Sequence, residues 1–76
     1  MQSFDRITFS PDQMGGRPCI RHLRVTVGMI VGQIGEGVGI DDLLRDYAYL
    51  EREDILQALR FAAWRASERE LPLVEA

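Results

Sequence analysis

The hydrophobic pattern divides the chain into a turn-rich first part and a helical second part. Residues 6–9 (Arg6-Ile7-Thr8-Phe9) alternate polar and apolar side chains, which is typical of a short strand. Turn-forming residues follow, and residues 18–20 are suited to pair back on the first strand. The pattern therefore predicts a β-hairpin at about residues 6–21. Two strands alone are marginal in water, so the hairpin must lie on helices or on a second copy.

Three helices are predicted after the hairpin. Thr26 is a suitable N-cap for a helix over residues 27–36, and Gly37 suits its C-terminal stop. Acidic residues at the favourable N-terminal end indicate a second helix over residues 40–46. A third helix is predicted over residues 51–68, and Pro72 leaves residues 71–76 as a short tail.

This order of elements predicts one mainly α domain over residues 1–76. A short second helix and a third helix after a tight connector describe a helix-turn-helix. The expected fold is a three-helix, helix-turn-helix-like (homeodomain-like) bundle with a short N-terminal β-hairpin. In that motif the start of the third helix enters the DNA major groove.

On a helical wheel the third helix carries two apolar surfaces. Ile55, Leu59, Ala62 and Ala66 fall on one stripe, which is the predicted core face. Phe61 and Trp64 lie on the opposite side. Either the hairpin or the tail covers them, or they contact a partner protein, since aromatic clusters rimmed by arginine are typical of interfaces. The candidate partner-binding residues are Phe61, Trp64, Arg65, Arg69, Leu71 and Leu73.

Three glycines form a strip on the first helix beside its apolar stripe. Gly28, Gly32 and Gly35 each cost helix stability, so the strip indicates a place where another backbone approaches. That neighbour is either the hairpin or third helix of the same chain, or the same helix of a second copy. The glycines are therefore candidate dimer residues.

Charge is unevenly distributed along the 76 residues. Nine arginines and no lysine face twelve acids, for a net charge of −3. Residues 40–55 alone carry six acids and two arginines, which argues against DNA reading by the third helix, because such a surface repels phosphates. Residues 17–24 carry no acid. Their candidate DNA-binding side chains are Arg17, Arg21, His22 and Arg24, unless these pair with the acids of the helices.

Several functional classes are disfavoured. The single cysteine, Cys19, cannot form an internal disulfide, and the spacing from Cys19 to His22 supplies only two zinc ligands. No apolar run reaches the length of a membrane span, and the N-terminus lacks the pattern of a signal peptide. No nucleophile and base stand out as a pair. We therefore expect a soluble cytoplasmic protein that is not an enzyme, with no metal, cofactor, small-molecule substrate or membrane partner.

Two sequence segments resemble a known family. The first segment that carries the resemblance is Met14-Gly15-Gly16-Arg17-Pro18-Cys19-Ile20-Arg21, and the second contains Asp46-Tyr47 and Glu53-Asp54-Ile55. The chain is similar to the small bacterial domain-of-unknown-function family 433 over roughly residues 6–66. The resemblance implies a helix-turn-helix-like domain with an N-terminal hairpin. It also implies an antitoxin role, often beside a toxin that resembles a PIN-domain ribonuclease. The family pattern usually has Gly-Thr where this chain has His22-Leu23, and often has Thr where it has Glu51.

Three functional hypotheses follow. The first is a non-enzymatic, dimeric antitoxin that neutralises a PIN-like ribonuclease by direct binding and represses its own operon. The second is a DNA-binding transcriptional regulator that uses the N-terminal arginine-rich patch. The third is a self-assembling interaction module. A domain this small buries only about 60% of its unfolded surface, which favours completion by association in each case.

Overall fold

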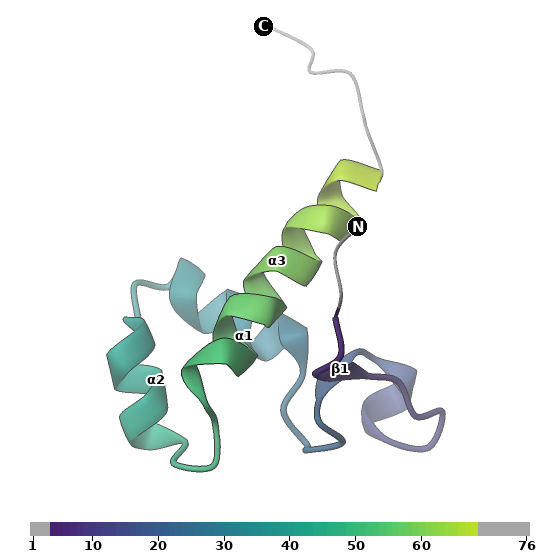
Figure 1. Ribbon diagram of the computed structural model, residues 1–76, viewed down its shortest axis with the longest axis horizontal. Helices are drawn as coiled ribbons and strands as arrows, with labels where there is room; N and C mark the ends of the chain where they lie inside the picture. The colour runs from purple at the N-terminus through teal and green to yellow at the C-terminus, as the bar shows by residue number, and fades with distance from the viewer. Residues whose placement is uncertain (1–3, 69–76) are drawn as a thin grey trace, which may run out of the picture.

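A computed structural model describes residues 4–68. The strands are β1 (Ile7–Thr8) and β2 (Cys19–Ile20), separated by a short 3-10 turn, η1 (Met14–Gly16). The helices are α1 (Val27–Gly35), α2 (Ile40–Asp46) and α3 (Arg52–Glu68). The predicted mainly α fold with a short N-terminal hairpin is confirmed (Figure 1). Among the described residues, no helix combines the length and apolar character needed to cross a bilayer.

The hairpin is antiparallel and brings Ile7 opposite Ile20. Its second strand also pairs on its other side, where Cys19 forms a bridge with Thr26 at the start of α1. The backbone N–H of Ile20 donates to the carbonyl of Val25 at 2.9 Å. The hairpin is thus joined directly to the first helix.

Both predicted ends of α1 are confirmed. The Thr26 hydroxyl oxygen accepts a hydrogen bond from the Met29 N–H at 3.0 Å, as expected of an N-cap. At the other end Gly37 has φ +98°, a left-handed conformation that favours glycine. The N–H groups of Gly37 and Val38 return to the carbonyls of Ile34 and Gln33, which is the Schellman arrangement.

The core contains a large, fully buried aliphatic side chain from β2 and from each helix. These are Ile20, Ile30, Leu43 and Ile55. Helix α1 lies across α3, and α2 packs beside the first turns of α3 (Figure 1).

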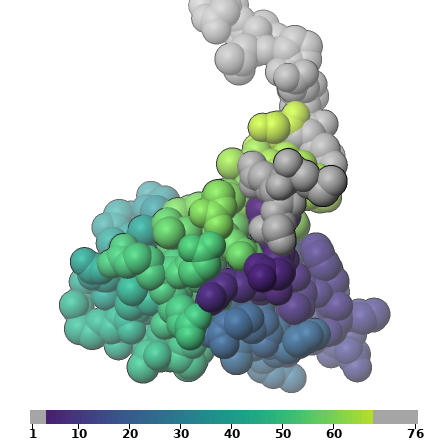
Figure 2. All heavy atoms as spheres, in the orientation of Figure 1, coloured from purple at the N-terminus to yellow at the C-terminus, as the bar shows by residue number. Residues whose placement is uncertain are grey.

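The predicted core stripe of α3 is confirmed in part, since Leu59 and Ala62 do pack against the core, but it is not the main buried face of the helix. Ile55 is buried as expected, but Ala66 is exposed and Leu59 and Ala62 are only partly buried. The buried face instead runs through Ala58 and Phe61 and includes two polar residues, Asp54 and Gln57. The wheel counted aliphatic residues only. The N-terminal segment, residues 4–6, covers this face of α3 and bonds to the side chains of Asp54 and Gln57. Figure 2 shows that N-terminal segment (dark purple) seated against α3 (green).

Candidate functional site

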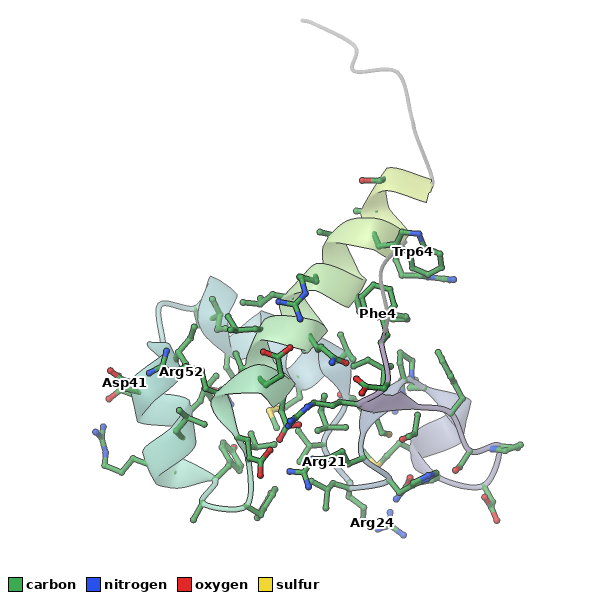
Figure 3. All side chains as sticks on the ribbon, in the orientation of Figure 1. Phe4, Arg21, Arg24, Asp41, Arg52 and Trp64 are labelled. Carbon is green, nitrogen blue, oxygen red and sulfur yellow. The ribbon has the colours of Figure 1, made fainter. Side chains whose placement is uncertain are left out.

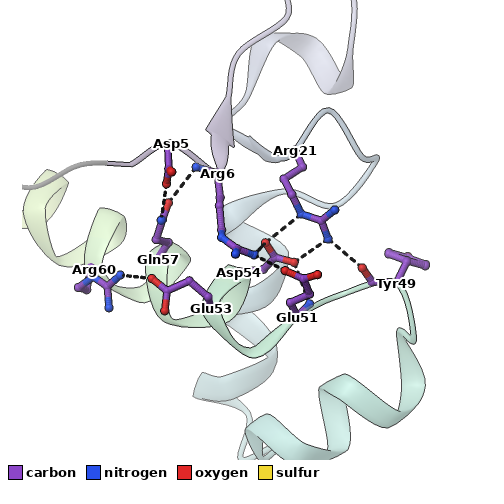
Figure 4. Close-up of polar contacts among 9 residues, drawn as sticks. All are labelled: Asp5, Arg6, Arg21, Tyr49, Glu51, Glu53, Asp54, Gln57 and Arg60. Carbon is purple, nitrogen blue, oxygen red and sulfur yellow. Dashed lines mark hydrogen bonds and ion pairs between the residues drawn. The ribbon is translucent and has the colours of Figure 1, made fainter.

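A fully buried carboxylate, Asp54, joins the hairpin to the start of α3 (Figure 4). Its Oδ1 accepts hydrogen bonds from Arg6 Nη1 at 2.9 Å and Arg21 Nε at 3.0 Å. Its Oδ2 accepts from Arg21 Nη2 at 2.7 Å and from the backbone N–H of Glu51 at 2.8 Å. The last contact is the N3-to-N-cap half of a capping box. Asp54 therefore closes the helix end and anchors the hairpin at once.

The strand register explains why both arginines reach the same carboxylate. With Ile7 opposite Ile20, Arg6 lies opposite Arg21, and the Arg21 N–H donates to the Arg6 carbonyl at 2.8 Å. Like charges opposite one another destabilise a strand pair. Asp54 lies between the two guanidinium groups and removes that repulsion. The Glu51 carboxylate adds a second acceptor for Arg6 at 2.6 Å.

The pKa of Asp54 reflects these contacts. Burial by itself raises the pKa of this carboxyl group. The hydrogen bonds from Arg21, from the Glu51 backbone and from Arg6 outweigh burial, so that the pKa lies below its ordinary value. Asp54 is therefore ionised in the folded protein at neutral pH.

Gln57 extends the same junction by one turn of α3. Its Oε1 accepts from the backbone N–H of Arg6 at 3.0 Å, and its Nε2 donates to Asp5 Oδ1 at 2.7 Å. The side chain thus holds the chain just before β1. Its amide has both a donor and an acceptor contact, which accounts for its burial in the core.

Ion pairs neutralise most of the acidic segment 40–55. Arginines within the segment pair with its own acids: Arg52 bonds Asp41, and Arg45 bonds Asp42. The other three paired acids are contacted by arginines from outside the segment. Arg6 contacts both Glu51 and Asp54, Arg21 also contacts Asp54, and Arg60 contacts Glu53. With these three arginines counted, the segment carries one excess acidic charge rather than four. The two arginines of the segment, Arg45 and Arg52, are themselves engaged in ion pairs within the fold.

Arg21 differs from the other candidate DNA-binding side chains. Besides its contacts with Asp54, its Nη2 donates to the carbonyl of Tyr49 at 2.8 Å, in the connector between α2 and α3. The alternative in which the basic residues pair with acids of the helices is confirmed for Arg21, which pairs with Asp54 of α3. Arg21 is a structural link between the hairpin and the α2–α3 connector.

The remaining basic candidates gather in two adjoining turns. Arg17 Nε donates to the carbonyl of Met14 at 3.0 Å, and Arg24 Nη1 lies 3.9 Å from the sulfur of the same methionine. Gln13 Nε2 donates to the carbonyl of His22 at 2.8 Å. Arg17, His22 and Arg24 are exposed, and we call these three residues the basic cluster.

A second surface collects aromatic rings at the junction of the N-terminal segment and α3 (Figure 3). The Phe61 ring centroid lies 5.3 Å from that of Phe4, 6.1 Å from that of Phe9 and 5.9 Å from that of Trp64. Phe61 is buried, with 7% exposed, whereas Phe9 and Trp64 remain 58% and 42% exposed. Phe4, Phe9, Phe61 and Trp64 are called the aromatic patch below.

The alternative in which another segment of the chain covers these residues is confirmed for Phe61, and the contact with a partner protein stays a prediction for Trp64. The N-terminal segment covers Phe61, and it leaves a large part of Trp64 open to solvent. Arg65 follows Trp64 and is also exposed. The other candidate partner residues, Arg69, Leu71 and Leu73, lie outside the described residues, as does the predicted tail over residues 71–76.

The glycine strip of α1 faces open space within the described chain. A Cβ atom placed on Gly32 or Gly35 meets no heavy atom within 4 Å, and one on Gly28 meets only the Thr26 hydroxyl oxygen at 3.9 Å. A close approach by the hairpin or by α3 therefore does not explain these glycines. Their role in a dimer stays a prediction.

The contacts of Asp54 and Gln57 were not predicted from sequence. The helix dipole alone accounts for acids at the start of the third helix, and the helical wheel places Gln57 beside Phe61 and Trp64, opposite the predicted core stripe. Asp54 lies 48 residues from Arg6 and 33 from Arg21, so spacing alone gives no signal of these pairs. An acid at the third position of a helix does indicate a capping contact, and it was the one available clue.

The geometry defines a small helix-turn-helix-like domain whose hairpin is locked to its third helix by a buried carboxylate. The family described as "Protein of unknown function (DUF433)" matches residues 7–62. The chain belongs to this family, and the resemblance stated from its sequence motifs is confirmed.

A solved structure supports the same assignment. The chain is similar to the crystal structure of a DUF433 member protein from Anabaena variabilis, with a TM-score of 0.78 and 27% sequence identity. The match covers 83% of this chain and 62% of that one, so this chain spans about three fifths of the length of its structural neighbour. No curated protein gave a significant match.

Proposed function

We propose that this protein is a non-enzymatic antitoxin that neutralises a PIN-like ribonuclease by binding it through the aromatic patch. The partially exposed pair of Trp64 and Phe9 carries the proposal. Both rings sit around the buried Phe61, on a surface that leaves them accessible. The antitoxin role implied by the resemblance to the family supports this assignment.

The patch has the composition of a binding hot spot. Tryptophan and arginine are enriched among residues that dominate interface energies, and a central aromatic group needs a surrounding that excludes water. Trp64 has Phe4 on one side, with ring centroids 5.7 Å apart, and exposed Arg65 follows it in the chain. A ribonuclease with an acidic metal site suits such a surface, since an arginine at the edge of the patch complements acidic side chains.

The proposal is tested first by co-expression with the product of the neighbouring gene. We expect the two chains to co-elute from a sizing column, and the neighbour to degrade RNA only after it is separated from this protein. Light scattering on this chain alone measures its oligomeric state and tests the predicted dimer. Separate elution of the two chains would contradict the proposal.

Trp64→Ser is expected to weaken toxin binding by at least about thirtyfold, because loss of a hot-spot tryptophan costs 2 kcal/mol or more. Isothermal titration calorimetry measures the affinity. Tyr49→Ser is the matched control, since it removes an aromatic ring that is 54% exposed at the α2–α3 connector. Equal losses for the two variants would argue against a specific patch. Loss of self-association with unchanged toxin affinity would instead place Trp64 at a self-interface.

A further inference from the structure

We propose that the basic cluster of Arg17, His22 and Arg24 binds the phosphate backbone of duplex DNA. The site lies on the turns of the hairpin rather than on the third helix, and it does not include Arg21. This function is separate from toxin binding. Figure 3 shows Arg24 at one end of the molecule and Trp64 toward the other.

The first argument is the pairing of the arginines. Within residues 4–68, Arg6, Arg21, Arg45, Arg52 and Arg60 each contact a carboxylate. Arg17 and Arg24 contact Met14 instead, through its carbonyl oxygen and its sulfur, and neither forms an ion pair with a described acid. Their positive charges are therefore uncompensated locally and available to an anion.

The second argument is backbone strain. The described residues other than glycine with positive φ are Met14 at +51°, Arg21 at +45° and His22 at +62°, and all three lie in the two turns that carry the cluster. A left-handed conformation is strained for a residue with a Cβ, because the Cβ approaches the following carbonyl oxygen. Such strain gathers at binding sites, where the surroundings hold it in place.

The third argument is the position of the cluster beside the helix-turn-helix connector. The hydrogen bond from Arg21 to the Tyr49 carbonyl ties the turn at residues 21–24 to the connector between α2 and α3. The turn that carries His22 and Arg24 is thus held near the connector of the helix-turn-helix. The pairing of acids in the segment 40–55 lowers the repulsion that phosphates would meet there.

Duplex DNA fits these observations better than single-stranded nucleic acid. Single strands are bound by stacking of bases on open aromatic rings. Within the described residues three aromatic side chains are exposed. Two of them, Phe9 and Trp64, belong to the aromatic patch. The third, Tyr49, packs edge-on against Tyr47 with ring centroids 6.2 Å apart. A pre-formed cluster of guanidinium groups suits the regular phosphate array of a duplex.

The test measures fluorescence anisotropy of a labelled, mixed-sequence DNA duplex between about 50 and 200 mM salt. We expect Arg17→Gln with Arg24→Gln to weaken binding at least about tenfold and to reduce the slope of log K against log salt by about 2 per chain. Arg60→Gln with Arg45→Gln is the matched control: it removes the same charge from arginines that are paired with Glu53 and Asp42, so the slope should stay unchanged, and any loss of affinity caused by the two freed acids should be smaller than the loss for the cluster variant. His22→Gly should raise the midpoint of thermal unfolding by roughly 4–8 °C while weakening DNA binding.

Several results would overturn the proposal. They are an absence of duplex binding at the lowest salt, an equal loss for the control pair, or tighter binding of a single-stranded RNA of the same length. Circular dichroism confirms that each variant is folded before it is compared. None of these results bears on toxin binding, which is measured separately with Trp64→Ser.

Discussion

Asp54→Asn is expected to lower the free energy of unfolding by about 3 kcal/mol. The substitution keeps the shape of the side chain but removes the charge that two arginines and the Glu51 N–H share. Hydrogen bonds to a charged group contribute about 1.5–3 kcal/mol each, and the buried Asn side chain would retain only weaker, neutral versions of them, while the partly exposed arginines are compensated in part by water. Urea denaturation followed by circular dichroism measures the change. Asp46→Asn is the control, since this exposed acid forms no ion pair with a described residue. A loss below about 1 kcal/mol would show that Asp54 does not lock the fold.

The same carboxylate predicts the direction of the pH dependence. The pKa of Asp54 in the folded protein lies below the ordinary value of 3.8. Its stabilising contribution is therefore complete well above pH 4 and is lost as the pH falls through 3.8 toward the folded-state pKa. Denaturation midpoints at neutral pH and below pH 4 test this. The Asp54→Asn variant should show a shallower loss than the wild type, and parallel curves for the two proteins would contradict the assignment.

Phe61→Ala is expected to lower the free energy of unfolding by about 3–4 kcal/mol. Its ring is buried and contacts Phe4, Phe9 and Trp64, so truncation leaves a cavity between α3 and the N-terminal segment. Trp64→Ala should cost about 1 kcal/mol, because much of that ring is already in water. Thermal or urea unfolding distinguishes the two variants. Equal losses would mean that Phe61 contributes no more to the stability of the core than the partly exposed Trp64 does.

Local patterns in the sequence were sufficient for the elements of the fold. The Thr26 cap, the Gly37 stop and the hydrophobic spacing located α1, and acids at the start of α2 located the second helix. Each of these signals involves residues within a few positions of one another. The fold class followed from the order of the elements.

The orientation of α3 and the roles of its polar residues depend on contacts distant in sequence. The N-terminal segment covers Phe61 and bonds to Asp54 and Gln57, and no periodicity within α3 reports the position of that segment. For the same reason Arg21 could not be separated from Arg17 and Arg24 by sequence. All three lie in one basic segment, but only Arg21 is opposite Arg6 in the strand register. The wheel likewise places Trp64 opposite the predicted core stripe but leaves open whether another segment of the chain covers it.

The central claim is that the aromatic patch neutralises a ribonuclease, and titration of ribonuclease activity tests it most directly. The purified product of the neighbouring gene is titrated with wild-type protein, with Trp64→Ser and with the Tyr49→Ser control, and RNA cleavage is followed. We expect the wild type and Tyr49→Ser to abolish cleavage at a fixed stoichiometric ratio, and Trp64→Ser to require a large excess. Full inhibition by Trp64→Ser at the wild-type ratio would contradict the account, as would continued cleavage in the presence of excess wild-type protein.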